Sequence, residues 1–213
     1  MRAVKIAVCV GLLTTLVFCE KHFNPPPAAP AATYPLHETH SDEKVTIAVE
    51  PCDTAEARKI FKVDYQKYGL FPYRLIITND SDSTLMLDEM EIQYITARRD
   101  KFRPATDDDI YRRLVRPSKV EKGDPGIKLP IPIGKKRPIS SDTIEEYHTA
   151  QFQKVPVTAH STNSGYLFFD MLEEDGPAAG AHLDLSGIKA GTKELFYFDI
   201  PLDKSSDART NPK

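Results

Sequence analysis

The feature that most constrains the fold of this chain is a series of short runs in which apolar and polar residues alternate. In the run VTIAV, Val45, Ile47 and Val49 fall on one face of an extended chain. Because successive side chains of a β-strand point to opposite faces of its sheet, this spacing is typical of a strand with one buried face. Strands are expected at residues 45–49, 59–65, 71–79, 85–97, 152–159, 166–171, 181–188 and 193–202.

The alternation changes face inside the run LMLDEMEIQYITA, which covers residues 85–97. Leu85 starts an alternation on odd positions, and Met90 starts one on even positions. A shift of one residue moves every following side chain to the other face. The run therefore predicts an extra residue near Asp88, either as a bulge or where the chain crosses between two sheets. The run YLFFDM at 166–171 is apolar on both faces, which is typical of a central strand.

The clearest helical pattern is PATDDDIYRRLVRP at residues 104–117. Thr106 is placed to cap the helix, and the three aspartates that follow lie at the positive end of the helix dipole. Pro117 ends the pattern. Residues 141–150, SDTIEEYHTA, predict a second short helix. The loop between these helices is rich in Gly, Pro and Lys, and its prolines exclude it from a central strand.

Short strands without regular intervening helices indicate an all-β fold. The 17 prolines and the absence of Trp fit a chain of strands and loops more than a helical one. We expect an immunoglobulin-like antiparallel β-sandwich at residues 45–203, with one short helix in an insertion at about 98–141. The polar residues 204–213 are expected to form a disordered tail.

The N-terminus has the pattern of an export signal. Arg2 and Lys5 accompany an apolar run at residues 6–18, which is shorter than the ~20 residues that a membrane-spanning helix needs. The sequence Leu-Val-Phe-Cys ending at Cys19 resembles a bacterial lipobox, although Phe18 stands where a small residue is usual. Residues 1–19 are therefore expected to be a signal peptide, with Cys19 lipidated. An uncleaved or differently cleaved signal is the alternative.

Residues 20–44 are expected to be a linker rich in Pro and Ala. The run NPPPAAPAAT cannot form a helix, because proline removes amide donors and fixes φ. His37 and His40, with Glu38 and Asp42, could bind a metal, but nothing in the pattern orients them as ligands, so a solvated linker is favoured. The segment would lift the following domain away from a membrane.

The charge of the chain argues against a nucleic-acid partner, and its cysteine content excludes a disulfide within the domain. The formal net charge is −3 with mixed signs, which argues against a nucleic-acid partner, since such proteins carry a basic stripe. Cys52 is the single cysteine in the expected domain, so that domain has no internal disulfide, and Cys52 is expected to be a small buried apolar residue.

Three stretches carry a resemblance to exported bacterial proteins. They are YGLFPYRLIITNDSDSTLMLDEMEI at 68–92, VPVTAHSTNSGYLFFDM at 155–171 and GTKELFYFDIPLD at 191–203. The chain resembles an uncharacterised group of such proteins, probable lipoproteins with a single immunoglobulin-like domain. The resemblance implies a sandwich fold and an association with the cell envelope. It implies no activity, cofactor or active-site residue, because a shared sandwich does not specify chemistry.

Sequence motifs of catalysis are absent from the chain. It contains no Gly-x-Ser-x-Gly, His-Glu-x-x-His, Cys-x-x-Cys or Gly-x-Gly-x-x-Gly. Residues 80–84, DSDST, alternate oxygen ligands like a calcium loop, but Leu85 replaces the glycine that such a loop needs, so a β-turn is expected. No catalytic, cofactor-binding or metal-binding residue is assigned. The histidines of the domain lie singly, at His148, His160 and His182.

These observations favour a non-catalytic binding or structural module, held at a membrane through Cys19 in the periplasm or on the outer surface. One alternative is a hydrolase or metal-dependent enzyme, which would gather a histidine and carboxylates in a pocket. Another is an assembly or chaperone-like protein that adds a strand to a long free sheet edge. Binding of a protein or an anionic polymer is expected in the insertion, through Arg98, Arg99, Arg103, Arg112, Arg113 and Arg116.

Overall fold

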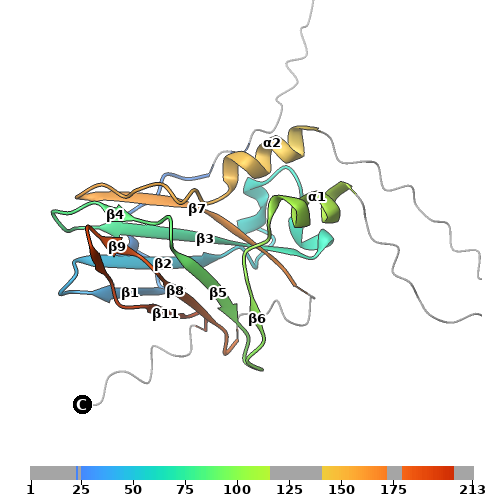
Figure 1. The fold of residues 1–213 in the computed structure, drawn as a ribbon. Helices are drawn as coiled ribbons and strands as arrows, with labels where there is room; N and C mark the ends of the chain where they lie inside the picture. The colour runs from blue at the N-terminus through green and yellow to red at the C-terminus, as the bar shows by residue number, and fades with distance from the viewer. Residues whose placement is uncertain (1–22, 24, 116–140, 172–178, 204–213) are drawn as a thin grey trace, which may run out of the picture.

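The computed structural model of this chain describes residues 23, 25–115, 141–171 and 179–203 (Figure 1). Within these residues it is mostly β, with three antiparallel sheets and two short α-helices. The strands are β1 (His37–His40), β2 (Val45–Pro51), β3 (Leu70–Asn79), β4 (Leu85–Met86), β5 (Glu91–Ile95), β6 (Lys101–Phe102), β7 (Ser161–Asp170), β8 (His182–Ser186), β9 (Lys189–Ala190), β10 (Lys193–Glu194) and β11 (Phe198–Pro201). The helices are α1 (Asp107–Val115) and α2 (Ser141–Ala150), with 3₁₀-helices η1 (Ala31–Thr33), η2 (Ala57–Ile60) and η3 (Tyr65–Tyr68).

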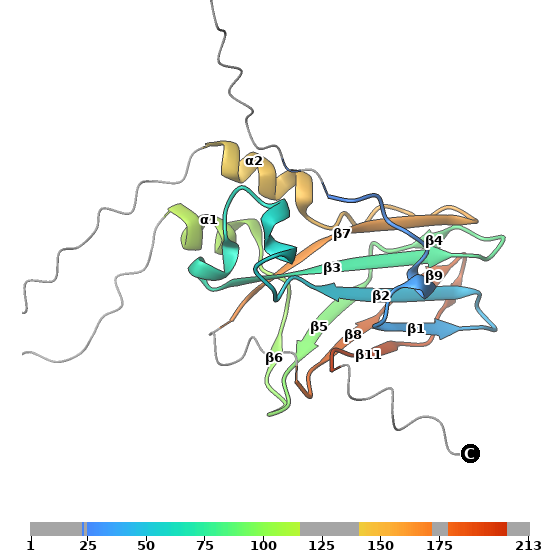
Figure 2. The same cartoon turned by 180° about the vertical axis from the view of Figure 1, so that it is seen from behind.

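Two four-stranded sheets form the two layers of the molecule, which Figure 2 shows from behind. The first has the order β1-β2-β3-β7 and the second β11-β8-β5-β6, and a small sheet β10-β9-β4 lies at one end. Between β4 and β5 the chain leaves the small sheet and enters the second large one. It does so through a turn in which the Met90 N–H donates to the Leu87 carbonyl at 3.1 Å. The predicted change of face is therefore confirmed, as a crossing between sheets.

The main core fills the space between the two large sheets. Tyr73, Tyr94 and Phe169 form its aromatic centre, with ring centroids 5.4 to 5.7 Å apart. Val45, Ile47, Val49, Leu75 and Ile77 join it, all fully buried. Each large apolar side chain buried in this way contributes roughly 1.5–3 kcal/mol to stability. The all-β sandwich expected from the alternating runs agrees with this arrangement.

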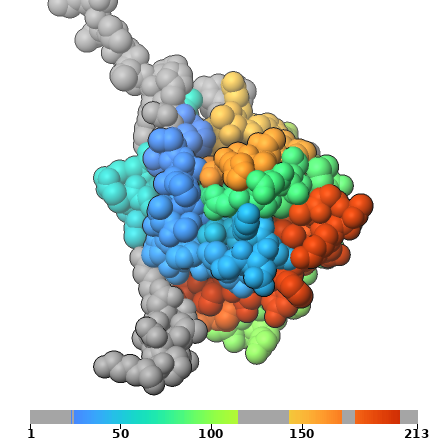
Figure 3. Space-filling model, turned by 90° about the vertical axis from the view of Figure 1, so that its left-hand side faces the viewer, coloured from blue at the N-terminus to red at the C-terminus, as the bar shows by residue number. Residues whose placement is uncertain are grey.

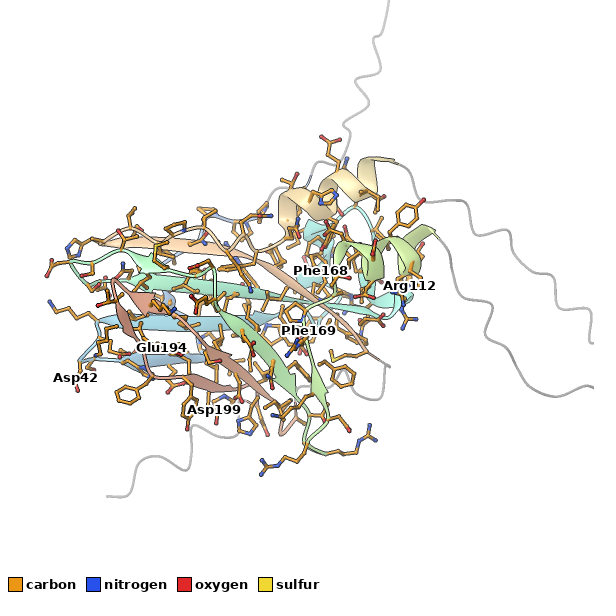
Figure 4. The ribbon with its side chains drawn as sticks, viewed as in Figure 1. Asp42, Arg112, Phe168, Phe169, Glu194 and Asp199 are labelled. Atoms are coloured by element: carbon orange, nitrogen blue, oxygen red, sulfur yellow. The ribbon has the colours of Figure 1, made fainter. Side chains whose placement is uncertain are left out.

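A second core lies on the opposite face of the first sheet, under α1, α2, η2 and η3. Phe168 points into this second core and its neighbour Phe169 into the main one, because adjacent strand residues face opposite sides (Figure 4). The helical cover explains why the run at 166–171 is apolar on both faces. The prediction of a central strand there is wrong, since β7 is the last strand of its sheet.

Helices α1 and α2 confirm the predictions for residues 104–117 and 141–150. Thr106 caps α1, because its hydroxyl oxygen accepts from the Asp109 N–H at 3.3 Å. The fold class as predicted contained one helix in an insertion at 98–141, whereas the structure has two, and residues 116–140 lie outside the described part.

Two predicted strands are not formed. Residues 59–65 belong to η2, η3 and the bend between them, because Phe61 and Tyr65, four residues apart, point into the second core together. Residues 152–159 make only isolated bridges, between Val157 and Leu85 and between the preceding Gln151 and Tyr166. The run at 193–202 is divided between β10 and β11.

Residues 20–44 were predicted to be a linker. That prediction is wrong for Ala31 and for His37 to His40, which belong to the folded sandwich. His37 to His40 form β1, which pairs antiparallel with β2. Further back, Ala31 is fully buried and its N–H donates to the Thr78 hydroxyl at 2.8 Å. The sequence did not predict β1 because its residues are polar, and an edge strand can leave polar side chains in solvent. The signal peptide at 1–19, with Cys19, and the tail at 204–213 lie outside the described residues.

Candidate functional site

The candidate site is a pocket of about 510 Å³ where the first and last strands of the fold meet. Its lining comes from β1 with the turn after it and from residues 193–197, and we call it the acidic–aromatic pocket. Figure 3 looks at this end of the molecule, where N-terminal residues border residues close to the C-terminus. The acidic lining residues are Glu38, Asp42 and Glu43, the aromatic ones Phe196 and Tyr197, and His40 and Lys193 are the basic ones.

His40 is held by carboxylates on both sides of its ring. Its Nδ1 lies 3.1 Å from Glu43 Oε2, and its Nε2 lies 3.0 Å from Glu38 Oε1. Glu38 shares a face of β1 with His40, and Glu43 is brought back by a tight turn that ends at Lys44, whose φ is +54°. In the imidazolium form both ring nitrogens donate, so the charged ring satisfies both contacts at once.

Glu43 and Glu38 also hold the chain on either side of the two aromatic residues. The Glu43 side chain is only 2% exposed, and its Oε1 accepts from Lys193 Nζ at 3.5 Å and from the Phe196 N–H at 3.4 Å. Glu38 Oε2 accepts from the Asp199 N–H at 2.6 Å. The loop that carries the aromatic pair is therefore attached to the first sheet by side-chain to backbone hydrogen bonds.

Phe196 and Tyr197 are the most exposed large apolar residues in the described part of the chain, at 74% and 66%. A single strand at residues 193–202, as predicted, would place Phe196 on the same side as Phe198 and Ile200. That is wrong for Phe196, since β11 and its alternation begin only at Phe198. Exposed aromatic residues beside polar groups are typical of binding surfaces.

A second pocket, of about 360 Å³, lies on the outer face of the second sheet and gathers His182, Asp184 and Asp199. The pairing of β8 with β11 sets Asp184 directly opposite Asp199. Burial, together with the charge and a hydrogen bond of Asp199, raises the pKa of Asp184. His182 Nδ1 lies 2.9 Å from Asp199 Oδ1. The two carboxyl groups can therefore share a proton beside an imidazole.

The predicted arginines of the β5–β6 region lie in or beside one turn. Arg98 pairs with Asp100 at 3.5 Å, and Arg99, whose φ is +72°, lines the second pocket. Arg103 follows β6 and is exposed.

The remaining predicted arginines belong to the region of α1. Arg112 pairs with Asp109 at 2.7 Å, and Arg113 Nε donates to Asp170 Oδ2 at 2.9 Å, which attaches α1 to β7. Arg116 lies outside the described residues. Arg112 lies on the far side of the molecule from Asp42 (Figure 4). The described arginines are thus divided between the β5–β6 region and α1, and several of them face carboxylates.

The turn predicted at residues 80–84 is organised by Asn79. Its side-chain amide donates to the carbonyls of Ser83 at 2.8 Å and Val157 at 3.0 Å, and its Oδ1 accepts from the Ser81 N–H at 3.0 Å. The turn is thereby confirmed. In the part of the chain that the structure describes, no group of three or more His, Cys, Asp or Glu residues could hold a metal ion.

Sequence reasoning did not identify the acidic–aromatic pocket. Residues 37–44 were interpreted as part of a linker. The pocket forms only because β1 pairs with β2 and packs against β11. One signal was present: LFYF at 195–198 has four apolar residues in a row, more than one face of a strand can bury.

Similarity to known proteins gives no indication of function, so the functional argument depends on the fold and the pockets. No protein-family model matches the chain, and neither the curated proteins nor the solved structures contain a match. Among the described helices, none is long and apolar enough to cross a membrane.

Proposed function

We propose that this chain is a non-catalytic binding module of the cell envelope, tethered to a membrane through a lipid on Cys19. In this proposal the sandwich is immunoglobulin-like and presents the acidic–aromatic pocket to a protein partner. The two facing antiparallel sheets and the chain crossing between them support the immunoglobulin-like assignment. The short apolar run before Cys19 supports export and anchoring.

The observation that carries the proposal is the exposed pair Phe196 and Tyr197 on a loop held in place from both ends. Hydrogen bonds from the Phe196 and Asp199 N–H groups to Glu43 and Glu38 restrict this loop before any partner binds. A surface ordered in advance loses less conformational entropy on association, so more of its contact energy appears as affinity. Exposed aromatic residues are also frequent energetic centres of protein interfaces.

The sheet edges give less support to the strand-addition alternative. In the described residues, the edge strands β1 and β11 have four residues each and β6 has two. The outer edge of β7 is occupied, because its Tyr166 and Phe168 carbonyls accept from the N–H groups of Phe152 and Ala105 at 2.9 and 2.6 Å. We therefore place partner binding in the pocket and not at an edge.

The test of the binding surface is crosslinking and capture from solubilised envelope with the full chain. The wild type is compared with Phe196→Ala/Tyr197→Ala and with Arg98→Ala/Arg112→Ala, which removes arginines of the surface first predicted. A partner captured by the wild type and the arginine variant, but lost with the aromatic variant, supports the proposal. Retention by the aromatic variant and loss with the arginine variant would return the site to residues 98–141.

The anchor is tested separately by Cys19→Ala. The variant is expected in the soluble fraction after cell lysis, with the wild type in the membrane pellet, because the substitution removes the thiol that carries the lipid, whose burial in the bilayer stabilises attachment by about 0.8 kcal/mol per CH₂ group. A variant that stays in the pellet would show that Cys19 is not the anchor.

A hydrolase is a second candidate function, favoured by the meeting of His182, Asp184 and Asp199 in one pocket. A carboxyl group that shares a proton can act as a general acid. The His182 and Asp199 side chains are 42% and 46% exposed, and catalytic electrostatics are strongest where water is excluded, so this reading has less support. Hydrolysis of chromogenic ester, peptide or glycoside substrates that is lost in Asp199→Asn would favour it over the binding module.

A further inference from the structure

The charge of the acidic–aromatic pocket indicates what kind of group it accepts. Its lining has three carboxylates, Glu38, Asp42 and Glu43, against Lys193 and His40. With both basic groups charged, the carboxylates still outnumber them by three to two. A pocket with an excess of carboxylates attracts cations and repels anions.

The aromatic rim suits the same class of ligand. Phe196 and Tyr197 line the pocket and are mostly exposed, so their ring faces are accessible to a bound group. A guanidinium or ammonium near an aromatic face is attracted by the ring quadrupole, by about 0.5–1 kcal/mol at an exposed site. An aliphatic stem beneath the charge can pack on the same rings.

Lys193 already occupies one cation position inside the pocket. Its Nζ lies 3.5 Å from Glu43 Oε1, yet its side chain is 68% exposed, whereas that of Glu43 is 2% exposed. A long exposed side chain can swing away from a buried carboxylate when another cation replaces it. The Lys193 contact thus marks where the charge of a ligand would sit.

We propose, resting on the function above, that the acidic–aromatic pocket receives an arginine or lysine side chain from a basic segment of the partner protein. The volume of about 510 Å³ is within the range of pockets that hold small ligands, and it accommodates one such side chain. In the complex the partner's cation faces Glu43 and Asp42, and its stem lies against Phe196 and Tyr197.

The experiment measures fluorescence anisotropy of labelled peptides added to the full chain. The probe is a short peptide in which arginine alternates with glycine, and the controls replace arginine by glutamate or by serine. The arginine peptide should bind, more weakly as salt rises, and the other two should not. Equal binding of the serine peptide, or no binding of the arginine peptide, would overturn the inference.

Variants locate the binding in the pocket. Phe196→Ala/Tyr197→Ala should weaken it about fivefold or more, since it removes two cation–π contacts that are each worth about twofold to fivefold. Asp42→Asn should weaken it about twofold to fivefold, since it removes one exposed ion pair. Lys193→Met should strengthen it, because it removes the competing internal cation. The controls Tyr111→Ala and Asp108→Asn remove one exposed aromatic ring and one carboxylate from α1, at the other end of the molecule, and should leave binding unchanged. Loss of binding in these controls, or no effect of Lys193→Met, would contradict the inference.

The inference and the proposed function can fail separately. If the envelope partner is lost with Phe196→Ala/Tyr197→Ala but the arginine peptide does not bind, the pocket binds a partner of another chemistry. If the arginine peptide binds in the pocket but the envelope partner is retained by that variant, the cation site stands and the proposed role of the surface falls.

Discussion

The imidazole of His40 stacks on the phenyl ring of Phe198, with ring centroids 3.8 Å apart and planes inclined by 10°. His40 belongs to β1 of the first sheet and Phe198 to β11 of the second. The contact therefore closes the open side of the sandwich. It also places His40 between Glu38 and Glu43, so the same ring supports the fold and the candidate site.

His40→Ala is expected to lower the free energy of unfolding by about 2 kcal/mol, because it removes a partner from the buried Glu43 carboxylate as well as the stacked ring. His40→Phe keeps the stacking and loses the hydrogen bonds, so its cost should be intermediate. Urea unfolding measures both. His37→Ala makes the same change at an exposed position of β1 and should cost far less; an equal cost would show that the position of the histidine is immaterial.

Gly165→Ala is expected to lower the free energy of unfolding by about 1–3 kcal/mol through overpacking. An added Cβ would lie 2.5 Å from Phe152 Cα and 2.9 Å from Phe152 N, and that backbone is held to β7 by the Phe152–Tyr166 hydrogen bond. Thermal unfolding checks the prediction, with Ser164→Ala on the same strand as control. A variant as stable as wild type would mean that residues 151–157 can move away from β7.

Glu146→Ala is expected to lower the free energy of unfolding by about 2 kcal/mol, since the buried Tyr65 hydroxyl and the partly buried Lys62 N–H both lose this acceptor. Glu146 Oε1 accepts from the Tyr65 hydroxyl at 3.2 Å and its Oε2 from the Lys62 N–H at 2.7 Å, which joins α2 to the segment before β3. Burial, with Glu146 beside it, raises the pKa of Tyr65. Chemical unfolding compares this variant with Glu145→Ala, an exposed neighbour on α2 that should have little effect.

Cys52 should resist alkylation by iodoacetamide at neutral pH in the folded protein. Burial, reinforced by the charges of Glu50 and Asp53, raises the pKa of this thiol to about 12, and only the thiolate reacts. Mass spectrometry of the digested protein locates the label. Rapid modification at Cys52 under native conditions would contradict its burial, whereas modification in denaturant is expected.

Asp184→Asn is expected to stabilise the protein at neutral pH by about 0.5 kcal/mol, a small value because the pair is largely open to solvent screening. Folding raises the pKa of Asp184, so the stability from its protonated form is complete below the ordinary aspartate pKa and is lost as pH rises through the folded value. The variant and wild type should therefore converge in acid. Thermal unfolding across pH tests this, with the exposed Glu91→Gln as control; a constant difference at all pH values would show that Asp184 does not titrate in this way.

The strands and the first helix were predictable to the extent that local patterns specify them. Alternation located β2, β3 and β8, and the cap at Thr106 located α1, since both depend on neighbours within a few residues. β1 could not be found in this way. Its polar residues pair with β2 across a turn, and a polar edge strand looks like a linker until its partner is known.

The candidate site was missed for the same reason. Glu38, His40 and Glu43 are more than a hundred and fifty positions from Phe196 in the chain, as the Phe196–Glu43 separation of 153 residues illustrates. Local sequence carries no information on which distant segments become neighbours. The arginines of the insertion looked like a patch because they are close in sequence, but the β5–β6 region and α1 take them to different places.

By itself the amino-acid order determined that this polypeptide forms antiparallel strands with one apolar face and that α1 begins at a capped acidic turn. It also determined that Cys52 has no disulfide partner in its domain. Those properties follow from side-chain spacing and backbone preference, which act over a few residues. Tertiary structure alone decided that Ala31 and β1 join the sandwich, and that three carboxylates, an imidazole and two exposed aromatic rings meet at its open side. Packing forces that choice, because the hydrophobic faces of sheets formed far apart along the chain are removed from water only by closing on one another.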